Sequence, residues 1–218
     1  MKKPGICAVI INRDEKALRE IEPFVELFEI RIDFIGEGWQ DIARQLEKPW
    51  IACARSAVEG GRWEKSEAER TEELVKASEL GCAMVDIEVE TRELGKIIPH
   101  IKKRTKCLLS FHELKKTPSL NSLKEIVKKQ MEAGADVCKV ITTAESLEDN
   151  LTILKLITEF PETRMVSFAM GQLGLVSRVL CPLVGGDFTY ASIEEGRESA
   201  PGQITARQLR KLYDMVPR

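Results

Sequence analysis

The sequence lacks the features that mark several broad classes of protein. Its formal net charge is only −2, whereas a domain that binds nucleic acid normally carries a basic surplus. No apolar run approaches the roughly 18 residues that a membrane-spanning helix needs. We therefore expect neither a nucleic-acid partner nor a membrane partner.

The start of the sequence does not predict a secretion signal, and the sequence lacks closely spaced cysteines. The short apolar stretch near its start leads directly into Asn12, Arg13 and Asp14, without a small-residue cleavage site. None of the six cysteines lie two or three residues apart, so the spacing of zinc knuckles and redox pairs is missing. Four of them fall in apolar runs, where free cysteine behaves as a small hydrophobe. These patterns predict a cytoplasmic protein without disulfides or a metal site.

What the sequence does contain is a regular alternation of short β-rich runs with helical segments. Helical patterns over residues 66–81 and 119–134 begin near serine caps and end at glycines. Eight such strand–helix units predict a (β/α)8 barrel, and without a visible linker we expect one domain over residues 1–218. A doubly wound open sheet would need a glycine-rich turn after an early strand, which is missing. The predicted strands are residues 5–11, 28–35, 50–56, 83–89, 107–113, 136–142, 164–170 and 187–193.

Charged residues recur in the second halves of the predicted strands, where such barrels place their active sites. Glu29, Arg31 and Asp33 alternate with apolar residues, so they share the face that we expect to point toward the barrel axis. Asp86 and Glu88 repeat this pattern on the fourth strand. Acidic residues at these positions are compatible with purely structural ion pairs as well as with substrate binding.

Lysine and histidine occur on adjacent predicted strands. Lys139 lies inside an apolar run and His112 near the end of the preceding strand, so both aim at one mouth of the barrel. Lysine is rarely buried without a partner or a use. Because the sequence around Lys139 offers no counter-charge, we expect apolar surroundings and nearby cations to lower its pKa. His100, among lysines at the end of a helix, is expected at the surface.

A neutral lysine amine can attack a ketone or aldehyde and form a Schiff base. The protonated imine then draws electrons and eases removal of a proton from the neighbouring carbon. A nearby histidine is the natural carrier for that proton. This chemistry, typical of imine-forming dehydratases and aldolases, needs neither a metal nor a cofactor.

Seven segments carry a resemblance to a known family. In order, and from about residue 5 to residue 212, they resemble the type I 3-dehydroquinate dehydratase family. The resemblance implies conversion of the small molecule 3-dehydroquinate to 3-dehydroshikimate in the shikimate pathway, through an imine and without a cofactor, by a homodimer. The segments are "FEIRID", "ACARSAVEGG", "VDIE", "LLSFHEL", "ADVCKV", "AMGQLGLVSRV" and "SAPGQIT".

The resemblance also implies roles for individual residues. Lys139 resembles the Schiff-base lysine, His112 the general acid/base, and Glu59 the carboxylate that orients the histidine. The remaining matches bind substrate: Glu29, Arg31 and Arg55 its hydroxyls, Arg178 its carboxylate, Ser199 and Gln203 as part of a closing loop, and Met170 against its ring.

The sequence departs from the family pattern at two points, and two alternative functions remain. Phe168 stands where many family members carry methionine, and the N-terminal hairpin that plugs the barrel floor in longer members is missing, which leaves the closure of the lower end open. A class I aldolase acting on a sugar phosphate is one alternative. Its phosphate site would follow strands seven and eight; Gly185 and Gly186 precede strand eight, but Gly196 and Gly202 follow it. The other alternative is a non-catalytic barrel that binds a hydroxy acid.

Overall fold

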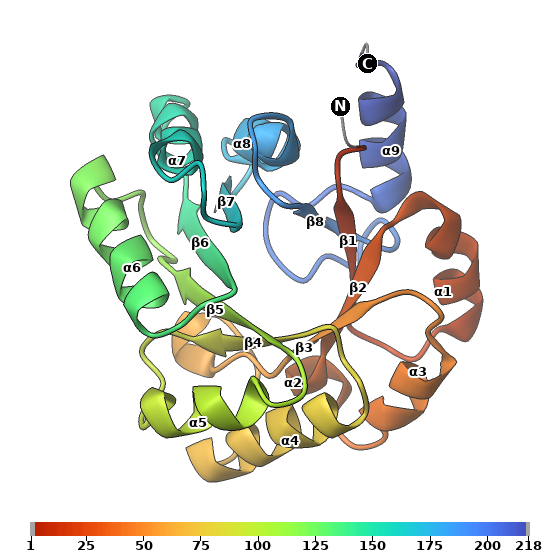
Figure 1. The fold of residues 1–218 in the computed structure, drawn as a ribbon. Helices are drawn as coiled ribbons and strands as arrows, with labels where there is room; N and C mark the ends of the chain where they lie inside the picture. The colour runs from red at the N-terminus through yellow and green to blue at the C-terminus, as the bar shows by residue number, and fades with distance from the viewer. Residues whose placement is uncertain (1–2, 217–218) are drawn as a thin grey trace.

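The computed structural model describes residues 3–216, which form a ring of parallel strands surrounded by helices (Figure 1). The sheet has eight strands in the order β7-β6-β5-β4-β3-β2-β1-β8; consecutive strands from β1 to β7 pair in parallel, and β8 pairs in parallel with β1. The strands are β1 (Ile6–Ile10), β2 (Leu27–Arg31), β3 (Trp50–Cys53), β4 (Met84–Glu88), β5 (Lys106–His112), β6 (Val137–Thr143), β7 (Met165–Met170) and β8 (Thr189–Ser192).

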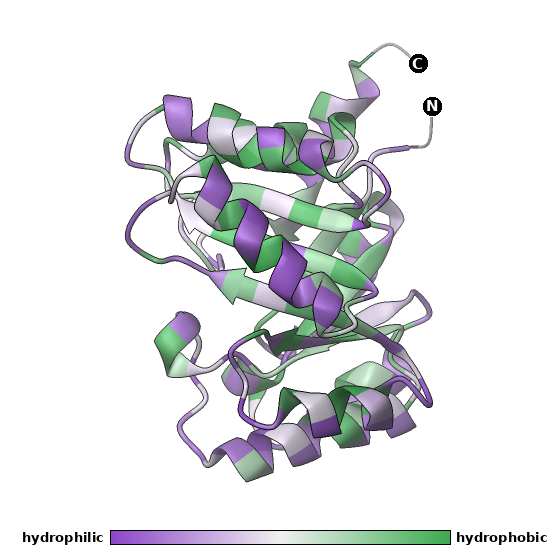
Figure 2. Cartoon of the chain, turned by 60° about the vertical axis from the view of Figure 1, so that its left-hand side comes forward, coloured by the Kyte–Doolittle hydropathy of each residue, from purple (hydrophilic) through white to green (hydrophobic). Residues whose placement is uncertain are grey.

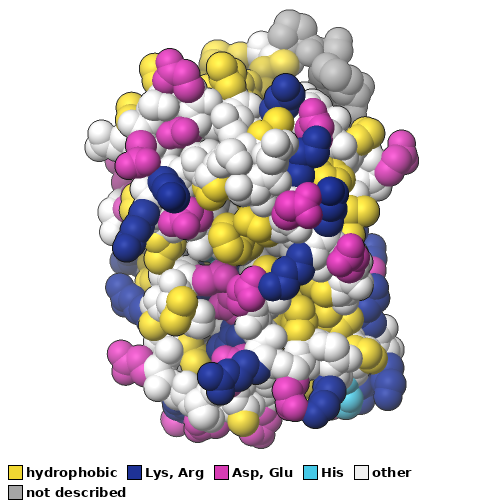
Figure 3. All heavy atoms as spheres, turned by 90° about the vertical axis from the view of Figure 1, so that its left-hand side faces the viewer, with side chains coloured by type: hydrophobic (Ala, Val, Ile, Leu, Met, Phe, Trp, Pro, Cys, Tyr) yellow, Lys and Arg dark blue, Asp and Glu magenta, His cyan; other side chains and the backbone are white. Residues whose placement is uncertain are grey.

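The helices cover the outside of this ring and show hydrophobic residues toward the strands and hydrophilic residues toward solvent (Figure 2). Of the helices in residues 3–216, not one has the length and apolar character needed to cross a membrane. The face in Figure 3 mixes acidic and basic side chains. The helices are α1 (Glu15–Ile21), α2 (Ile32–Ile35), α3 (Trp39–Gln45), α4 (Glu67–Glu79), α5 (Leu94–Ile101), α6 (Leu120–Glu132), α7 (Glu148–Glu159), α8 (Leu175–Leu180) and α9 (Ala206–Asp214), with 3-10 turns η1 (Glu22–Phe24), η2 (Ala57–Glu59) and η3 (Cys181–Leu183).

The two helices predicted from their caps are confirmed. Ser66 and Glu69 form a reciprocal capping box at the start of α4, and the Ser119 side chain accepts from the backbone at the start of α6. Gly81 and Gly134 follow these helices with φ of +87° and +93°, a conformation that glycine adopts without steric cost.

The predicted (β/α)8 barrel is confirmed as a nearly closed one. The two ends of the sheet order, β7 and β8, are not paired as a ladder. Just before β8, the Asp187 N–H donates to the Met165 carbonyl at 2.8 Å and joins the lower ends of the two strands. We call this place the β7–β8 seam.

The predicted extent of the second strand is wrong beyond Arg31. The ladder partners of β2 run out there, since Arg31 pairs with the last residue of β3, Cys53. Residues 32–35 instead close one helical turn, in which the Gly36 N–H donates to the Ile32 carbonyl at 2.9 Å. Asp33 therefore lies on α2 rather than on the strand, and its carboxylate pairs with Arg31 at 2.7 Å.

The barrel interior has an apolar lower layer and a polar upper layer. Inward-facing residues are two apart along each strand, so the polar Glu29, Asp86 and Lys139 each lie one inward position above an apolar residue. The lower layer fills the barrel beneath the site, at the end whose closure the sequence left open. Its buried members include Leu27, Ile51, Met84, Leu108, Val137 and Phe188.

Candidate active site

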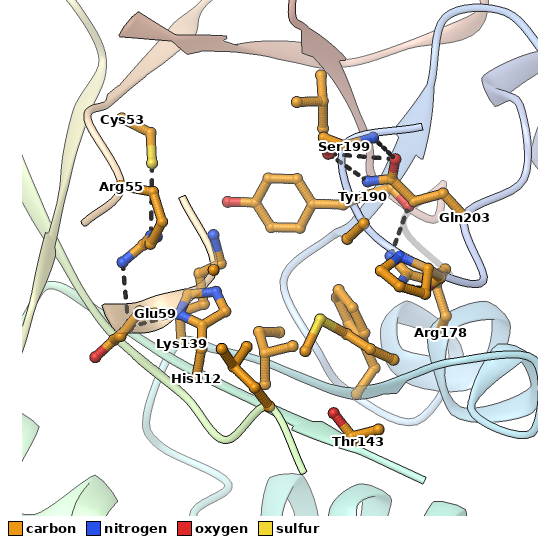
Figure 4. Close-up of a pocket in the computed structure, with 18 of the residues that line it drawn as sticks. Cys53, Arg55, Glu59, His112, Lys139, Thr143, Arg178, Tyr190, Ser199 and Gln203 are labelled. Atoms are coloured by element: carbon orange, nitrogen blue, oxygen red, sulfur yellow. Dashed lines mark hydrogen bonds and ion pairs between the residues drawn. The ribbon is translucent and has the colours of Figure 1, made fainter. Parts of the chain in front are cut away.

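A cavity of about 290 Å³ opens at the C-terminal ends of the strands (Figure 4). All ten site residues predicted from the sequence line it, so the barrel brings every one of them together. They are Glu29, Arg31, Arg55, Glu59, His112, Lys139, Met170, Arg178, Ser199 and Gln203.

Lys139 lies at the base of this cavity and is buried, with an exposed fraction of 4%. Its Nζ donates to Asp86 Oδ2 at 2.8 Å and lies 3.5 Å from Glu29 Oε2. It also lies 4.2 Å from the centre of the Tyr190 ring. Two carboxylates and an aromatic face therefore surround the amine, although its neighbours in the sequence carry no charge.

The predicted direction of the Lys139 pKa is wrong. Burial by itself lowers this pKa, but the charges of Asp86 and Glu29 outweigh burial and raise it above its ordinary value. The counter-charges come from β4 and β2, and Asp86 is 53 residues away in the sequence. In the unliganded site this nitrogen carries a proton, and its surroundings favour a positive charge there.

Arg55 links Asp86 to the other carboxylates of the site. It donates to Asp86 Oδ1 at 2.6 Å and to Ser110 Oγ at 2.7 Å, and it lies 3.2 Å from Glu88 Oε1. Glu88 is in turn paired with Arg70 from α4. The charges of Asp86 and Glu88 raise the Arg55 pKa well above its ordinary value despite burial, which alone lowers it.

His112 and Glu59 form a buried pair on the same side of the cavity. The distance between His112 Nδ1 and Glu59 Oε2 is 2.7 Å. Burial, with the cations Arg55 and Lys139, lowers the pKa of His112 well below its ordinary value. Burial also raises the pKa of Glu59 to about 8. With Nδ1 bonded to Glu59, the imidazole is neutral at neutral pH and the other nitrogen, Nε2, is left for a ligand.

A tight turn between β3 and α4 brings Glu59 to the histidine. Gly61 packs so closely on Arg55 that a Cβ atom there would lie 2.0 Å from the Arg55 carbonyl oxygen. Any side chain at this position would push the turn outward. Glycine therefore fixes Glu59, at the end of η2, within reach of both Arg55 and His112.

We call the connected ionisable side chains of Lys139, Asp86, Arg55, Glu59 and His112 the ionic wall. The opposite side, contributed by β7, α8 and β8, we call the aromatic wall. It comprises Phe168, Met170, Arg178 and Tyr190.

Arg178 differs from the other buried arginines of the described chain. Arg31, Arg55, Arg70 and Arg210 each contact at least one carboxylate. Within residues 3–216, Arg178 contacts none: it donates only to the carbonyls of Tyr190 and Pro201, both at 3.4 Å, and its Nε has no partner.

The guanidinium of Arg178 lies 4.3 Å from the centre of the Phe168 ring, and the residue as a whole is 1% exposed. Burial lowers the Arg178 pKa to about 9. A desolvated cation with unused donors is a ready site for an anion, and its planar fork suits a carboxylate.

The loop after β8 closes the upper side of the cavity. Within it, Gln203 Oε1 accepts from the Ser199 N–H at 2.9 Å, and Gln203 Nε2 donates to Ser199 Oγ at 3.0 Å. Gly202 has a φ of +75°, and a Cβ there would lie 2.2 Å from the Gly171 carbonyl oxygen. Glycine thus allows the loop to dock directly on the β7–α8 connection.

Three buried groups have the types and spacing of metal ligands. Single ligand atoms of Glu29, Cys53 and Asp86 lie within 4.8 Å of one another. The ammonium of Lys139 already contacts both carboxylates. Burial also raises the pKa of the Cys53 thiol well above its ordinary value, which disfavours the thiolate that a metal would require. The cluster therefore fits an ammonium group better than a metal ion.

Sequence reasoning missed two residues of the site. Asp86 was recognised only as an inward carboxylate, because nothing in the sequence shows that side chains of strands four and six, which flank strand five, meet in the interior. Tyr190 was not singled out at all, although it stands two residues after Phe188 in a predicted strand, with the spacing of inward-facing positions.

Comparisons with known proteins agree with this arrangement. Residues 6–217 match the family described as Type I 3-dehydroquinase. The chain is 43% identical over 216 residues to a 3-dehydroquinate dehydratase of Dehalococcoides mccartyi, covering 99% of this chain and 97% of the relative. It is 35% identical to the 3-dehydroquinate dehydratase of Methanocaldococcus jannaschii, covering 97% of this chain and 98% of the relative.

Solved structures show the same fold. The crystal structure of 3-dehydroquinate dehydratase from Geobacillus kaustophilus superposes with a TM-score of 0.84 at 28% identity, covering 100% of this chain and 93% of that one. A type I 3-dehydroquinate dehydratase from Clostridium difficile, solved with covalently modified comenic acid, gives a TM-score of 0.86 at 23% identity and covers 99% and 94%. The chain belongs to the type I 3-dehydroquinase family.

Proposed function

We propose that this protein is a 3-dehydroquinate dehydratase, a hydro-lyase that forms 3-dehydroshikimate and water through an imine on Lys139. Family membership and the named relatives support the reaction. The observation that carries the proposal is the contrast across the cavity: an amine and an imidazole on one side, and Arg178 without a carboxylate partner on the other.

The proposed substrate is an anionic polyol with a ketone, and each of its groups has a complement in the cavity. The carboxylate neutralises the charge of Arg178, the buried cation that lacks a carboxylate within the described residues. The ketone faces Lys139. Glu29, Arg31 and Arg55 provide donors and acceptors for the hydroxyls, and Met170 packs against the ring.

Imine formation begins at a protonated amine. Asp86, 2.8 Å from Nζ, orients the ammonium, and the proton that Lys139 must release before it attacks the C3 carbonyl ends on the oxygen that leaves as water. Loss of water then yields an iminium, which is again a cation at the same nitrogen. The carboxylates that raise the Lys139 pKa therefore also stabilise this intermediate.

Elimination uses the neutral imidazole. In the tautomer whose Nδ1–H donates to Glu59 Oε2, Nε2 of His112 has a free lone pair and removes a proton from C2, and the electrons move toward the iminium nitrogen. His112 then gives the proton to the departing C1 hydroxyl. Hydrolysis of the conjugated imine releases the product and restores Lys139. The loop that carries Ser199 and Gln203 excludes bulk water during these steps.

The direct test is to add 3-dehydroquinate to the purified protein and record the absorbance of the conjugated enone. Growth of that absorbance supports the proposal, and its absence at any substrate concentration contradicts it. The methyl ester of the substrate is a matched control, because it keeps the ketone and hydroxyls but cannot neutralise Arg178. We expect the ester to react far more slowly.

We also propose four further properties of the protein. They are a role in the shikimate pathway, a homodimeric assembly, a cytoplasmic location, and a single domain over residues 1–218. The near-complete mutual coverage of this chain and its relatives supports the single domain. Size-exclusion chromatography with light scattering would test the homodimer.

A further inference from the structure

Tyr190 presents a buried hydroxyl whose hydrogen bonds are unmet. The side chain lines the cavity and is 3% exposed, and its Oη has no hydrogen-bond partner within the described residues. Oε2 of Glu29 is likewise buried without a hydrogen bond there, and its one ionic contact is with the Lys139 ammonium at 3.5 Å. Because buried polar atoms are nearly always satisfied, two unmet atoms in one cavity indicate places that a ligand fills.

The two atoms have opposite hydrogen-bonding character. Burial, the charge of Glu29 and a contact with the Glu29 side chain that falls short of a well-formed hydrogen bond raise the Tyr190 pKa well above its ordinary value, so the phenol stays protonated and can donate. Glu29 as a carboxylate can only accept. A group that satisfies both at once must accept one hydrogen bond and donate another, which describes a hydroxyl.

The position of Tyr190 identifies which oxygen this is. The ring centre lies 4.2 Å from Lys139 Nζ, so the carbon that Nζ attacks, and the oxygen on that carbon, lie beside the ring. In Figure 4 the hydroxyl end of Tyr190 extends toward the side of the cavity from which Lys139 comes. The ketone oxygen accepts a hydrogen bond before attack, and as a carbinolamine hydroxyl it also donates.

We propose that Tyr190 is a further substrate-contacting residue, which rests on the proposed function above. Its hydroxyl donates to the oxygen on the carbon that Lys139 attacks, and Glu29 accepts from that oxygen once it is a hydroxyl. As the C–N bond forms, the carbonyl electron pair moves to the oxygen. Two of the three ammonium protons finally leave with this oxygen as water, and the third stays on the iminium nitrogen. The phenol keeps its own proton throughout.

The test replaces Tyr190 by phenylalanine, which keeps the ring and its contact with Lys139 and removes only the hydroxyl. Rapid mixing with 3-dehydroquinate followed by borohydride quenching measures the rate at which the reducible imine appears. Loss of one neutral hydrogen bond predicts that Tyr190→Phe forms the imine about three- to tenfold more slowly. Exchange of the C2 proton from the preformed imine should keep its wild-type rate.

The second tyrosine of the chain, Tyr213 on α9, is the matched control. Its hydroxyl is satisfied, since it donates to the Val179 carbonyl at 2.8 Å. Tyr213→Phe should lower the melting temperature and leave imine formation unchanged. Tyr190→Phe should leave the melting temperature of the free protein unchanged or raise it, because it removes an unmet polar group.

Two results would overturn the proposal. One is an unchanged rate of imine formation in Tyr190→Phe. The other is a raised KM with an unchanged rate, since the phenol would then contact another part of the ligand. The wild-type protein separates this proposal from the previous one: if it yields no reducible imine, the proposed function fails, whereas an imine formed equally fast in both proteins refutes only the role of Tyr190.

Discussion

The two sides of the cavity handle buried charge in opposite ways. On the ionic wall, every basic side chain has an acidic side chain within 4.0 Å: Lys139 and Arg55 both contact Asp86, and the neutral His112 contacts Glu59. On the aromatic wall, the guanidinium of Arg178 meets a Phe168 ring and two backbone carbonyls at 3.4 Å. The buried charges of the ionic wall are neutralised within the protein, whereas the charge of Arg178 on the aromatic wall is neutralised only by a ligand.

This difference assigns a separate task to each wall. A pre-formed ionic network does not reorganise as charge moves from the ammonium to the iminium, so it suits the reacting centre. An unmatched buried cation is costly in the free protein, and that cost is relieved by an anion. The ionic wall is therefore suited to chemistry and the aromatic wall to recognition of the substrate carboxylate.

The largest effect should follow from removing the amine of the ionic wall. Lys139→Ala cannot form an imine, so we expect turnover to fall below detection, measured by enone absorbance. Asp86 keeps its contact with Arg55 in this variant, and the fold should survive, as circular dichroism would verify. Lys128→Ala on the exposed face of α6 is the control. Near-normal turnover in Lys139→Ala would refute the mechanism.

Removing the imidazole should cost less than removing the amine. His112→Ala keeps Lys139 and Arg178, so it should still bind 3-dehydroquinate and still yield a borohydride-reducible imine. Its kcat should fall by about 10²- to 10⁴-fold, the usual contribution of a general acid/base. An unchanged kcat, or loss of the reducible imine, would show that His112 has a different task.

The comparison of the walls predicts opposite stability changes for two arginines. Arg55→Met removes the cation that Asp86 and Glu88 share and leaves them only Lys139 and Arg70, so it should destabilise the free protein by up to about 3–5 kcal/mol. Arg178→Met strands no carboxylate and should be neutral or stabilising, while kcat/KM falls by about 10- to 150-fold through lost carboxylate binding.

Thermal unfolding with and without 3-dehydroquinate measures both effects. The ligand should raise the Tm of the wild-type protein, and it should raise the Tm of Arg178→Met much less. If Arg178→Met were as destabilised as Arg55→Met in the absence of ligand, the distinction between the two walls would be lost.

The sequence predicted where the functional side chains lie, but not how they interact. The two-residue period of strands and the rule that barrel sites lie at strand ends placed Glu29, Arg31 and Lys139 correctly. The same period failed at Asp33, because a strand ends where its neighbours end, and those ends are set by partners elsewhere in the chain. The family resemblance supplied Arg178, which no local pattern singled out.

The wrong prediction for the Lys139 pKa has a related cause. Its surroundings in the sequence are apolar, whereas its surroundings in space are Asp86 and Glu29 from other strands. Electrostatic shifts depend on distances across the barrel, which the alternation of residues along one strand does not contain. The isolation of Arg178 was equally inaccessible, since the absence of a partner is a property of the whole packed interior.

The ionic wall also predicts a pH dependence of stability at Glu59. In the unfolded chain this carboxyl releases its proton near its ordinary pKa of 4.5, whereas in the folded protein it holds the proton to about 8. Folding is therefore increasingly penalised as the pH rises between these values. Glu59→Gln removes the penalty, so the Tm of the variant minus that of the wild type should increase from pH 4.5 to pH 8. A difference independent of pH would contradict the raised pKa.

The most direct measurement of the central claim is peptide mass mapping after borohydride reduction in the presence of 3-dehydroquinate. The ionic wall holds a cation at Nζ of Lys139, and an imine formed there is a cation in the same place. We predict one added ligand mass, on the peptide that contains Lys139, and none in Lys139→Ala. Labelling on a different lysine, or no labelling while the wild type turns over substrate, would contradict the account.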